Sequence, residues 1–222
     1  MALLHRAELR PSKIELVASW APTQPWFEAG AGAEPVTVGS FRFDDPAGEV
    51  GIETLLVQAG DGPAMQVPLT YRGAPLEGGD AWLIGTMQHS VLGRRWVYDG
   101  AGDPVYLTAV ATAALTGGRQ ADQYVDVDGE LVVREPTAVV VGSGTGSVTL
   151  PAPVPADRVS IRPEPGSTVV AAGDLRLVIV RTLRTDDRPD GLDRTDDAPS
   201  AVLTGTWAGQ GEPRTLVLVL AP

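Results

Sequence analysis

The residues best suited to bind a polar ligand lie close together near the middle of the chain. They are one histidine, two arginines and two aromatic residues: His89, Arg94, Arg95, Trp96 and Tyr98. Arginine and histidine side chains donate hydrogen bonds, and tryptophan and tyrosine offer flat rings on which a ligand can stack. If these side chains share one groove, the sequence favours a ligand-binding surface there.

Packing is the competing explanation for the same residues. Aromatic side chains at alternating strand positions bury large areas in a core, and a histidine at a strand end commonly serves as a hydrogen-bonding group. Neither His5 nor His89 has a second histidine or a carboxylate at metal-ligand spacing, and neither has the neighbours of a nucleophilic triad. The sequence therefore assigns no catalytic residue and no metal ligand.

Two other motifs have a functional interpretation that the sequence does not favour. The segment GSGTGS at 142–147 is glycine-rich, but it lacks the Lys-Ser/Thr of a phosphate-binding loop and precedes VTLPAPVP, which is no helix start. The acidic segment 186–197 lacks the alternating aspartate order and the glutamate of a calcium loop. We predict a turn and a solvated acidic loop, and we expect neither a metal nor a cofactor.

Composition and charge narrow the class of protein. The chain has 222 residues, of which 17 are basic and 28 acidic, giving a net charge of −11. This charge argues against nucleic acid and against an anionic membrane as partner. With no cysteine, disulfides and thiolate sites are excluded, and no apolar run is long enough to span a membrane. We expect a cytoplasmic protein.

The first half of the sequence predicts strands and two helices that would position the central residues. Helices are expected over 13–20, where Pro11 or Ser12 supplies the start, and over 104–116, where Asp103 caps the start and Gly117 ends the helix. Strands are expected over 36–43, 49–58, 65–72, 81–90 and 94–99. The first three strands are predicted to form an antiparallel meander with one buried face.

The second half reads as short strands separated by glycine, proline and aspartate turns. We predict an α+β, mostly β fold, in which an antiparallel sheet packs on a helix and a β-rich subdomain follows. The boundary is expected near residue 128, giving subdomains 1–128 and 129–222, which should pack into one unit.

Four blocks of the sequence, taken in order, resemble the N-terminal cap of bacterial maltokinases and related glucosamine kinases. They are SWAPTQPWFEAG, QVPLTYRGAPLEGG, LIGTMQHSVLGRRWVYDG and DPVYLTAVATAALTGG. Those enzymes are similar to aminoglycoside phosphotransferases and are associated mainly with actinobacteria. The resemblance covers roughly residues 16 to 118. A weaker similarity continues, since 162–183 and 201–220 resemble strands of a kinase N-lobe.

The resemblance implies where catalytic residues should lie, and this sequence does not supply them. In the family, the catalytic and metal-binding aspartates belong to a helical C-lobe that has no counterpart here. The lysine that holds the ATP phosphates corresponds to Val180, or to Arg181 after a one-residue shift. Without these groups phosphoryl transfer loses its charge stabilisation.

The expected function is accordingly that of a non-catalytic binding or regulatory module linked to trehalose, maltose or glycogen metabolism. Two alternatives stay open: a docking subunit for a separate sugar kinase or other sugar-metabolic enzyme, and an enzyme with residual sugar-kinase-type activity. A homodimer is a further expectation, since a lobe that has lost its partner lobe would leave an apolar face uncovered.

Overall fold

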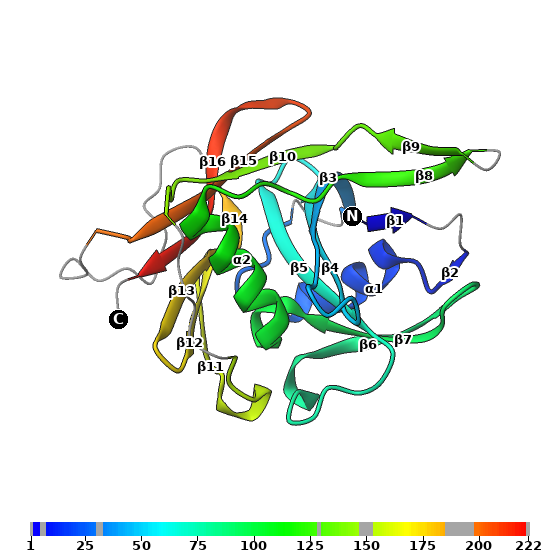
Figure 1. The fold of residues 1–222 in the computed structure, drawn as a ribbon, viewed down its shortest axis with the longest axis horizontal. Helices are drawn as coiled ribbons and strands as arrows, with labels where there is room; N and C mark the ends of the chain where they lie inside the picture. Colours follow the sequence, from blue (N-terminus) through cyan, green and yellow to red (C-terminus); the bar gives the residue numbers. More distant parts are fainter. Residues whose placement is uncertain are drawn as a thin grey trace.

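The described residues of the computed structural model form three β-sheets and two α-helices (Figure 1). The structure describes residues 2–4, 8–29, 33–127, 130–146, 153–184 and 198–220, with only the backbone of 2–4 and 125–127. Within these ranges strand is far more abundant than helix, which confirms the predicted α+β, mostly β class. No helix of the described part is long and apolar enough to cross a membrane.

The largest sheet is antiparallel and corresponds to the first half of the chain. Its strands run in the order β2-β6-β7-β5-β4-β3, and a short strand from the second half, β14, pairs with β5. They are β2 (Leu9–Arg10), β3 (Pro35–Phe43), β4 (Gly51–Ala59), β5 (Ala64–Arg72), β6 (Leu83–His89), β7 (Gly93–Asp99) and β14 (Thr182–Leu183). The predicted meander β3-β4-β5 is confirmed.

The second sheet belongs to the second half and is also antiparallel, in the order β10-β15-β16-β13-β12-β11. Its strands are β10 (Ala138–Gly142), β11 (Ser160–Glu164), β12 (Ser167–Ala172), β13 (Leu175–Val180), β15 (Ala201–Trp207) and β16 (Gln210–Leu220). A third, three-stranded sheet contains β1 (Ala2–Leu4), β8 (Gln123–Val127) and β9 (Glu130–Arg134), with β1 parallel to β8.

Both predicted helices form where the sequence placed them, and their ends show why. Helix α1 (Lys13–Trp20) begins after Ser12, whose hydroxyl accepts from the Glu15 N–H while Glu15 accepts from the Ser12 N–H. Helix α2 (Pro104–Thr116) begins after Asp103, which accepts from the Val105 N–H, and ends at Gly117 with φ 70°. Short 3-10 turns occupy Ala21–Thr23, Asp80–Trp82, Gly100–Gly102 and Ala156–Arg158.

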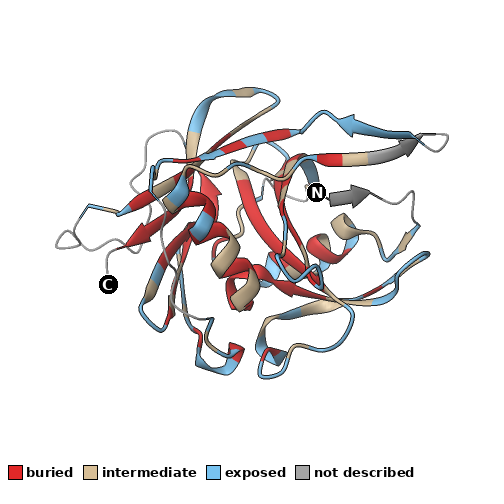
Figure 2. Cartoon of the chain, viewed as in Figure 1, coloured by how far each residue is buried: buried red, intermediate tan, exposed pale blue. Residues whose placement is uncertain are grey.

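The central strands β4 and β5 are covered on both faces, so the prediction of one buried face was wrong. On one face, α1 packs over Leu55, Val57 and Val67. On the other, α2 and the second sheet pack over Ile52 and Leu56. The apolar residues of β5 alternate with polar ones, and this pattern predicts that only the apolar face is buried. In the structure, the polar residues Gln66 and Thr70 of the other face are fully buried as well. Figure 2 shows the buried residues concentrated on these central elements.

The two halves share one core across the seam between the large sheets. The main cluster joins Leu56 and Tyr106 of the first half with Leu177, Leu216 and Val217 of the second. Gln66 on β5 donates from Nε2 to the carbonyl oxygens of Val180 and Leu216, both at 3.0 Å. The predicted subdomain boundary at 128 falls between β8 and β9, which pair with each other. The boundary therefore stays a prediction.

Candidate recognition surface

The five residues predicted to bind a ligand lie on one hairpin, made of β6 and β7, but not on one face of it. Arg94, Trp96 and Tyr98 alternate along β7 and so point to the same face. Arg95 points to the opposite face, together with His89, which pairs with Gly93. The structure therefore does not gather the five into a single groove. Whether either face binds a ligand stays a prediction.

His89 stabilises the hairpin turn. Its Nδ1 accepts hydrogen bonds from the backbone N–H groups of Val91 and Leu92, at 3.2 and 3.1 Å. An accepting Nδ1 carries no proton. Beside it, Arg95 donates from Nη2 to the Leu92 carbonyl at 2.6 Å. Both side chains thus fold back on the turn, as a hydrogen-bonding histidine at a strand end should.

Arg94 and Trp96 form the part of the cluster that is open to solvent. The Arg94 guanidinium lies over the Trp96 ring, 6.0 Å from its centroid, an arrangement in which the ring face attracts the cation. Arg94 is exposed and Trp96 half-buried. By contrast, Tyr98 is buried, and its hydroxyl accepts from the Leu76 N–H at 2.8 Å, so its polar end already has a partner.

Two apolar residues at the hairpin turn were missed by the sequence reasoning. Val91 and Leu92 are 57% and 47% exposed. They precede Gly93, whose φ of 74° lets the chain reverse. Gly93 could have indicated this in the sequence, because a glycine there marks a hairpin turn, and the apolar residues before it then lie in the turn and stay exposed. We define the hairpin-tip surface as Val91, Leu92, Arg94 and Trp96.

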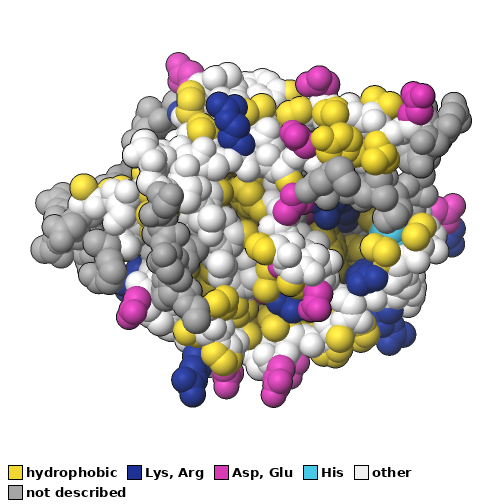
Figure 3. Space-filling view, viewed as in Figure 1, with side chains coloured by type: hydrophobic (Ala, Val, Ile, Leu, Met, Phe, Trp, Pro, Cys, Tyr) yellow, Lys and Arg dark blue, Asp and Glu magenta, His cyan; other side chains and the backbone are white. Residues whose placement is uncertain are grey.

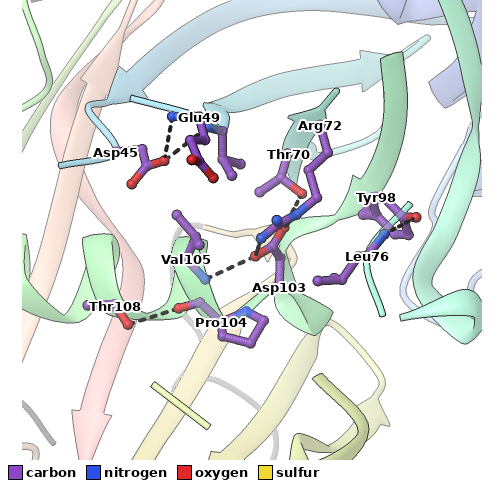
Figure 4. A network of polar contacts seen from close by, with 11 residues as sticks. Asp45, Glu49, Thr70, Arg72, Leu76, Tyr98, Asp103, Pro104, Val105 and Thr108 are labelled. Atoms are coloured by element: carbon purple, nitrogen blue, oxygen red, sulfur yellow. Dashed lines mark hydrogen bonds and ion pairs between the residues drawn. The ribbon is translucent and has the colours of Figure 1, made fainter. Parts of the chain in front are cut away.

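A buried polar network ties α2 to β5 next to this hairpin (Figure 4). Asp103 accepts two hydrogen bonds from Arg72, both 2.7 Å, and one from the Thr70 hydroxyl at 2.7 Å. Burial alone would lower the pKa of Arg72, but the hydrogen bonds and charge of Asp103 raise it above its usual value. The sequence identified Asp103 as a helix cap but not its second role as the partner of Arg72.

A second ion pair lies in the seam between the two large sheets. Arg181 is fully buried and donates from Nη2 to both carboxylate oxygens of Asp99, at 2.9 and 2.6 Å. Its Nε donates to the Thr168 hydroxyl, and its guanidinium lies 5.0 Å from the centroid of the Trp26 ring. Nη1 has no hydrogen-bond partner among the described residues. This arginine faces the interior and cannot meet a ligand in solvent.

A third network lies under α1. Lys13 donates to Glu53 at 2.6 Å, and the Tyr71 hydroxyl donates to the same carboxylate at 2.9 Å. Burial alone would raise the pKa of Glu53, but the charges of Lys13 and Arg42 and the two hydrogen bonds bring it below its ordinary value. Burial, and then the charge of Glu53, raise the pKa of Tyr71 well above its ordinary value. Lys13 and Tyr71 thus give the buried Glu53 carboxylate a counterion and two hydrogen bonds.

In its described part, 142–146, the glycine-rich segment leaves the end of β10 as an irregular stretch over the C-terminal end of α2. Gly144 donates its N–H to the Ala114 carbonyl at 2.9 Å. A Cβ on Gly144 would lie 1.8 Å from the Leu115 carbonyl oxygen, so only glycine fits. Helix C-termini present carbonyl oxygens and negative partial charge, which repel phosphate. This geometry disfavours a phosphate loop. The predicted turn between strands stays a prediction, because residues 147–152 lie outside the described residues.

Metal ligands do not cluster in the described part of the chain, where no group of three or more histidine, aspartate or glutamate residues could hold an ion. The acidic segment 186–197 and His5 lie outside the described residues. The structure therefore does not test the predicted acidic loop.

Comparison with known families finds a match for the region that contains the hairpin. Residues 20–103 match the maltokinase N-terminal cap domain. This confirms the resemblance of that region to the cap, which here comprises β3 to β7 and ends at the residue that caps α2. No curated protein matches the chain. The hairpin-tip surface, Arg72 and Asp99 all lie within the cap-like region, whereas Arg181 lies outside it.

Proposed function

We propose that this protein is a non-catalytic, maltokinase-cap-like binding module that serves trehalose, maltose or glycogen metabolism in the cytoplasm. The match of residues 20–103 to the maltokinase cap carries the proposal. Its ligand is a sugar of that metabolism or a protein that acts on one. The link to this metabolism is taken from the family, and the non-catalytic character from the residues of the second half.

The positions that correspond to the phosphate-holding lysine support a non-catalytic role. Val180 is apolar and buried, and the Arg181 guanidinium already forms an ion pair with Asp99. A cation that stabilises a transferred phosphoryl group must reach the phosphate oxygens. Moving Arg181 to solvent would leave the Asp99 carboxylate buried without its counterion, which is costly. The fold therefore favours a structural arginine over a nucleotide-binding one.

The hairpin-tip surface is the proposed contact site. It combines exposed apolar groups, Val91 and Leu92, with a cation over an aromatic ring, Arg94 over Trp96. Tryptophan and arginine are the residues most enriched where binding energy concentrates. The positive charge is local, because the whole chain carries −11. Such a site suits a partner with an apolar or sugar-ring surface beside a negative charge.

The test combines a turnover assay with a binding assay. The purified protein should consume no ATP with maltose, glucosamine or glucose, and ATP-magnesium should not raise its melting temperature. Binding would be measured by calorimetry with maltose, trehalose and a purified maltokinase as separate titrants. We expect one of the three to bind, and Trp96→Ala to weaken that binding roughly tenfold or more. Val36→Ala, an exposed apolar position on β3, is the matched control.

Two results would contradict the proposal. ATP consumption above the rate of a heat-denatured sample would show an enzyme. Binding that Trp96→Ala leaves intact and Val36→Ala weakens would move the contact site away from the hairpin tip. Absence of binding to all three titrants would remove the link to this metabolism while leaving the non-catalytic part standing.

A further inference from the structure

The strand β9 is an edge of its sheet and differs from the edge strands β2, β3, β10 and β11 in being exposed along its whole length. All five residues from Glu130 to Arg134 are exposed. The three central ones, Leu131, Val132 and Val133, are 51%, 46% and 54% exposed. Hydrophobic atoms accordingly gather at the upper right of Figure 3, where Figure 1 places β9. An apolar strand with one unpaired backbone edge is a template for another strand.

The edge strands of the two larger sheets, β2, β3, β10 and β11, are protected. The outer edge of β10 is covered, because Thr137 bonds Ser40 of β3 and Val141 bridges Arg119. Strand β11 contains Pro163, which has no N–H to donate to a neighbouring strand. At the edges of the largest sheet, β2 is only two residues long, and β3 begins at a proline. Strand β9 has no proline and no covering element among the described residues.

The sequence of β9 is complementary to itself when two copies run antiparallel. If Val132 of one copy lies opposite Val132 of the other, then Leu131 lies opposite Val133, and Glu130 lies opposite Arg134. Because the arrangement is twofold symmetric, the Glu130–Arg134 pairing occurs twice, once at each end of the apolar centre. Among the described residues, neither Glu130 nor Arg134 forms an ion pair with another side chain.

The backbone also permits this register. In an antiparallel ladder alternate residues direct their N–H and C=O groups to a given neighbour. The groups not used by β8 therefore belong either to residues 131 and 133 or to 130, 132 and 134. Both sets are symmetric about Val132, so a twofold axis there pairs every outward group with its counterpart. A register shifted by one residue would lose this symmetry and separate the charges.

We infer that this protein forms a homodimer through antiparallel pairing of β9 with β9 of a second copy, centred on Val132. The two three-stranded sheets then join into one continuous sheet, with four apolar residues on one face and the two valines flanked by ion pairs on the other. This inference does not depend on the proposed function, because β9 lies outside the cap-like region.

The experiment uses charge reversal and reconstitution. Glu130→Arg places two arginines opposite each other at both ends of the interface, and Arg134→Glu places two glutamates there. Each variant alone should dimerise about tenfold or more weakly than the parent, as two attractive cross-strand pairs become two repulsive ones. An equimolar mixture of the two variants restores both pairs, so it should form heterodimers with nearly the parent affinity. Sedimentation equilibrium of the full chain measures all four samples.

Three results would overturn the inference. The parent could stay monomeric up to about 1 mM, which leaves no association of useful strength. The parent could dimerise while both variants dimerise equally well, which places the interface elsewhere. The mixture could associate no better than either variant alone, which excludes the register centred on Val132. Circular dichroism of each variant shows that loss of the dimer is not loss of the fold, and recovery in the mixture shows it independently.

Discussion

The molecule uses the same pair of side chains, an arginine over a tryptophan ring, in two regions with opposite consequences. In the seam between the large sheets, Arg181 lies over Trp26 at 5.0 Å; at the hairpin tip, Arg94 lies over Trp96 at 6.0 Å. Arg181 is fully buried and forms an ion pair with the Asp99 carboxylate, whereas Arg94 is exposed. Burial and a counterion, rather than residue type, decide which arginine holds the fold together and which can meet a partner.

The largest expected effect comes from breaking the buried pair. Arg181→Met should lower the free energy of unfolding by about 3–5 kcal/mol, because it leaves the Asp99 carboxylate buried without its counterion. Urea unfolding followed by tryptophan fluorescence measures the change. A loss below about 1 kcal/mol, typical of an ordinary surface site, would mean that the seam admits water and that Arg181 is not structural.

Asp103 should come next, since its partner Arg72 is intermediate in exposure, at 19% of its side chain. Asp103→Ala removes both the helix cap and the ion pair, and we expect a loss of about 3 kcal/mol. Asp103→Asn keeps a capping side chain and should recover about 1 kcal/mol of it. Thermal and urea unfolding of both variants separates the two roles. Equal losses would show that the cap contributes nothing measurable.

The network under α1 predicts how stability depends on pH. The lowered pKa of Glu53 means that its contribution is fully present above the unfolded value of about 4.3. This contribution is lost as the pH falls through the lower value of the folded state. Glu53→Gln should therefore cost stability near neutral pH and should flatten the decline in acid. Urea unfolding between about pH 3 and pH 6 measures it. An unchanged acid slope in the variant would contradict the assignment.

The smallest effect is expected at the exposed pair. Arg94→Met, the same substitution as in the seam, should change the unfolding free energy by about 0.5 to 1 kcal/mol at most, the value of an exposed cation–ring contact. It should act on ligand binding instead. Urea unfolding beside Arg181→Met gives the comparison directly. A destabilisation as large as that of Arg181→Met would place Arg94 among the structural residues.

Local signals in the sequence were enough to predict most elements. The helix ends at Asp103 and Gly117 were predictable because caps depend on the residues beside them. For the first helix the sequence offered Pro11 or Ser12, and the structure shows that Ser12 is the cap. Strand pairing from β3 to β5 followed from turn residues. A 3-10 turn at Asp80–Trp82 delays β6, which was expected from residue 81. Local patterns thus locate elements well and boundaries less well.

The candidate site was less predictable because it depends on contacts between distant parts of the chain. Sequence spacing grouped Arg94 and Arg95, but strand alternation sends them to opposite faces. Tyr98 looked available for stacking, yet its side chain is buried and its hydroxyl accepts a hydrogen bond from the Leu76 N–H. The ion pair between Arg181 and Asp99 joins residues 82 positions apart, so no local sequence pattern predicts it. Burial on both faces of β5 likewise required the second sheet.

The central claim is that Arg181 is a structural cation locked to Asp99 across the seam, and a double-mutant cycle tests it most directly. Unfolding free energies would be measured for the parent, Arg181→Met, Asp99→Leu and the double variant. We predict a coupling energy of about 2 kcal/mol or more, so that the double variant is far more stable than the sum of the single losses implies. Additive losses would show that the two groups do not interact and would contradict the account.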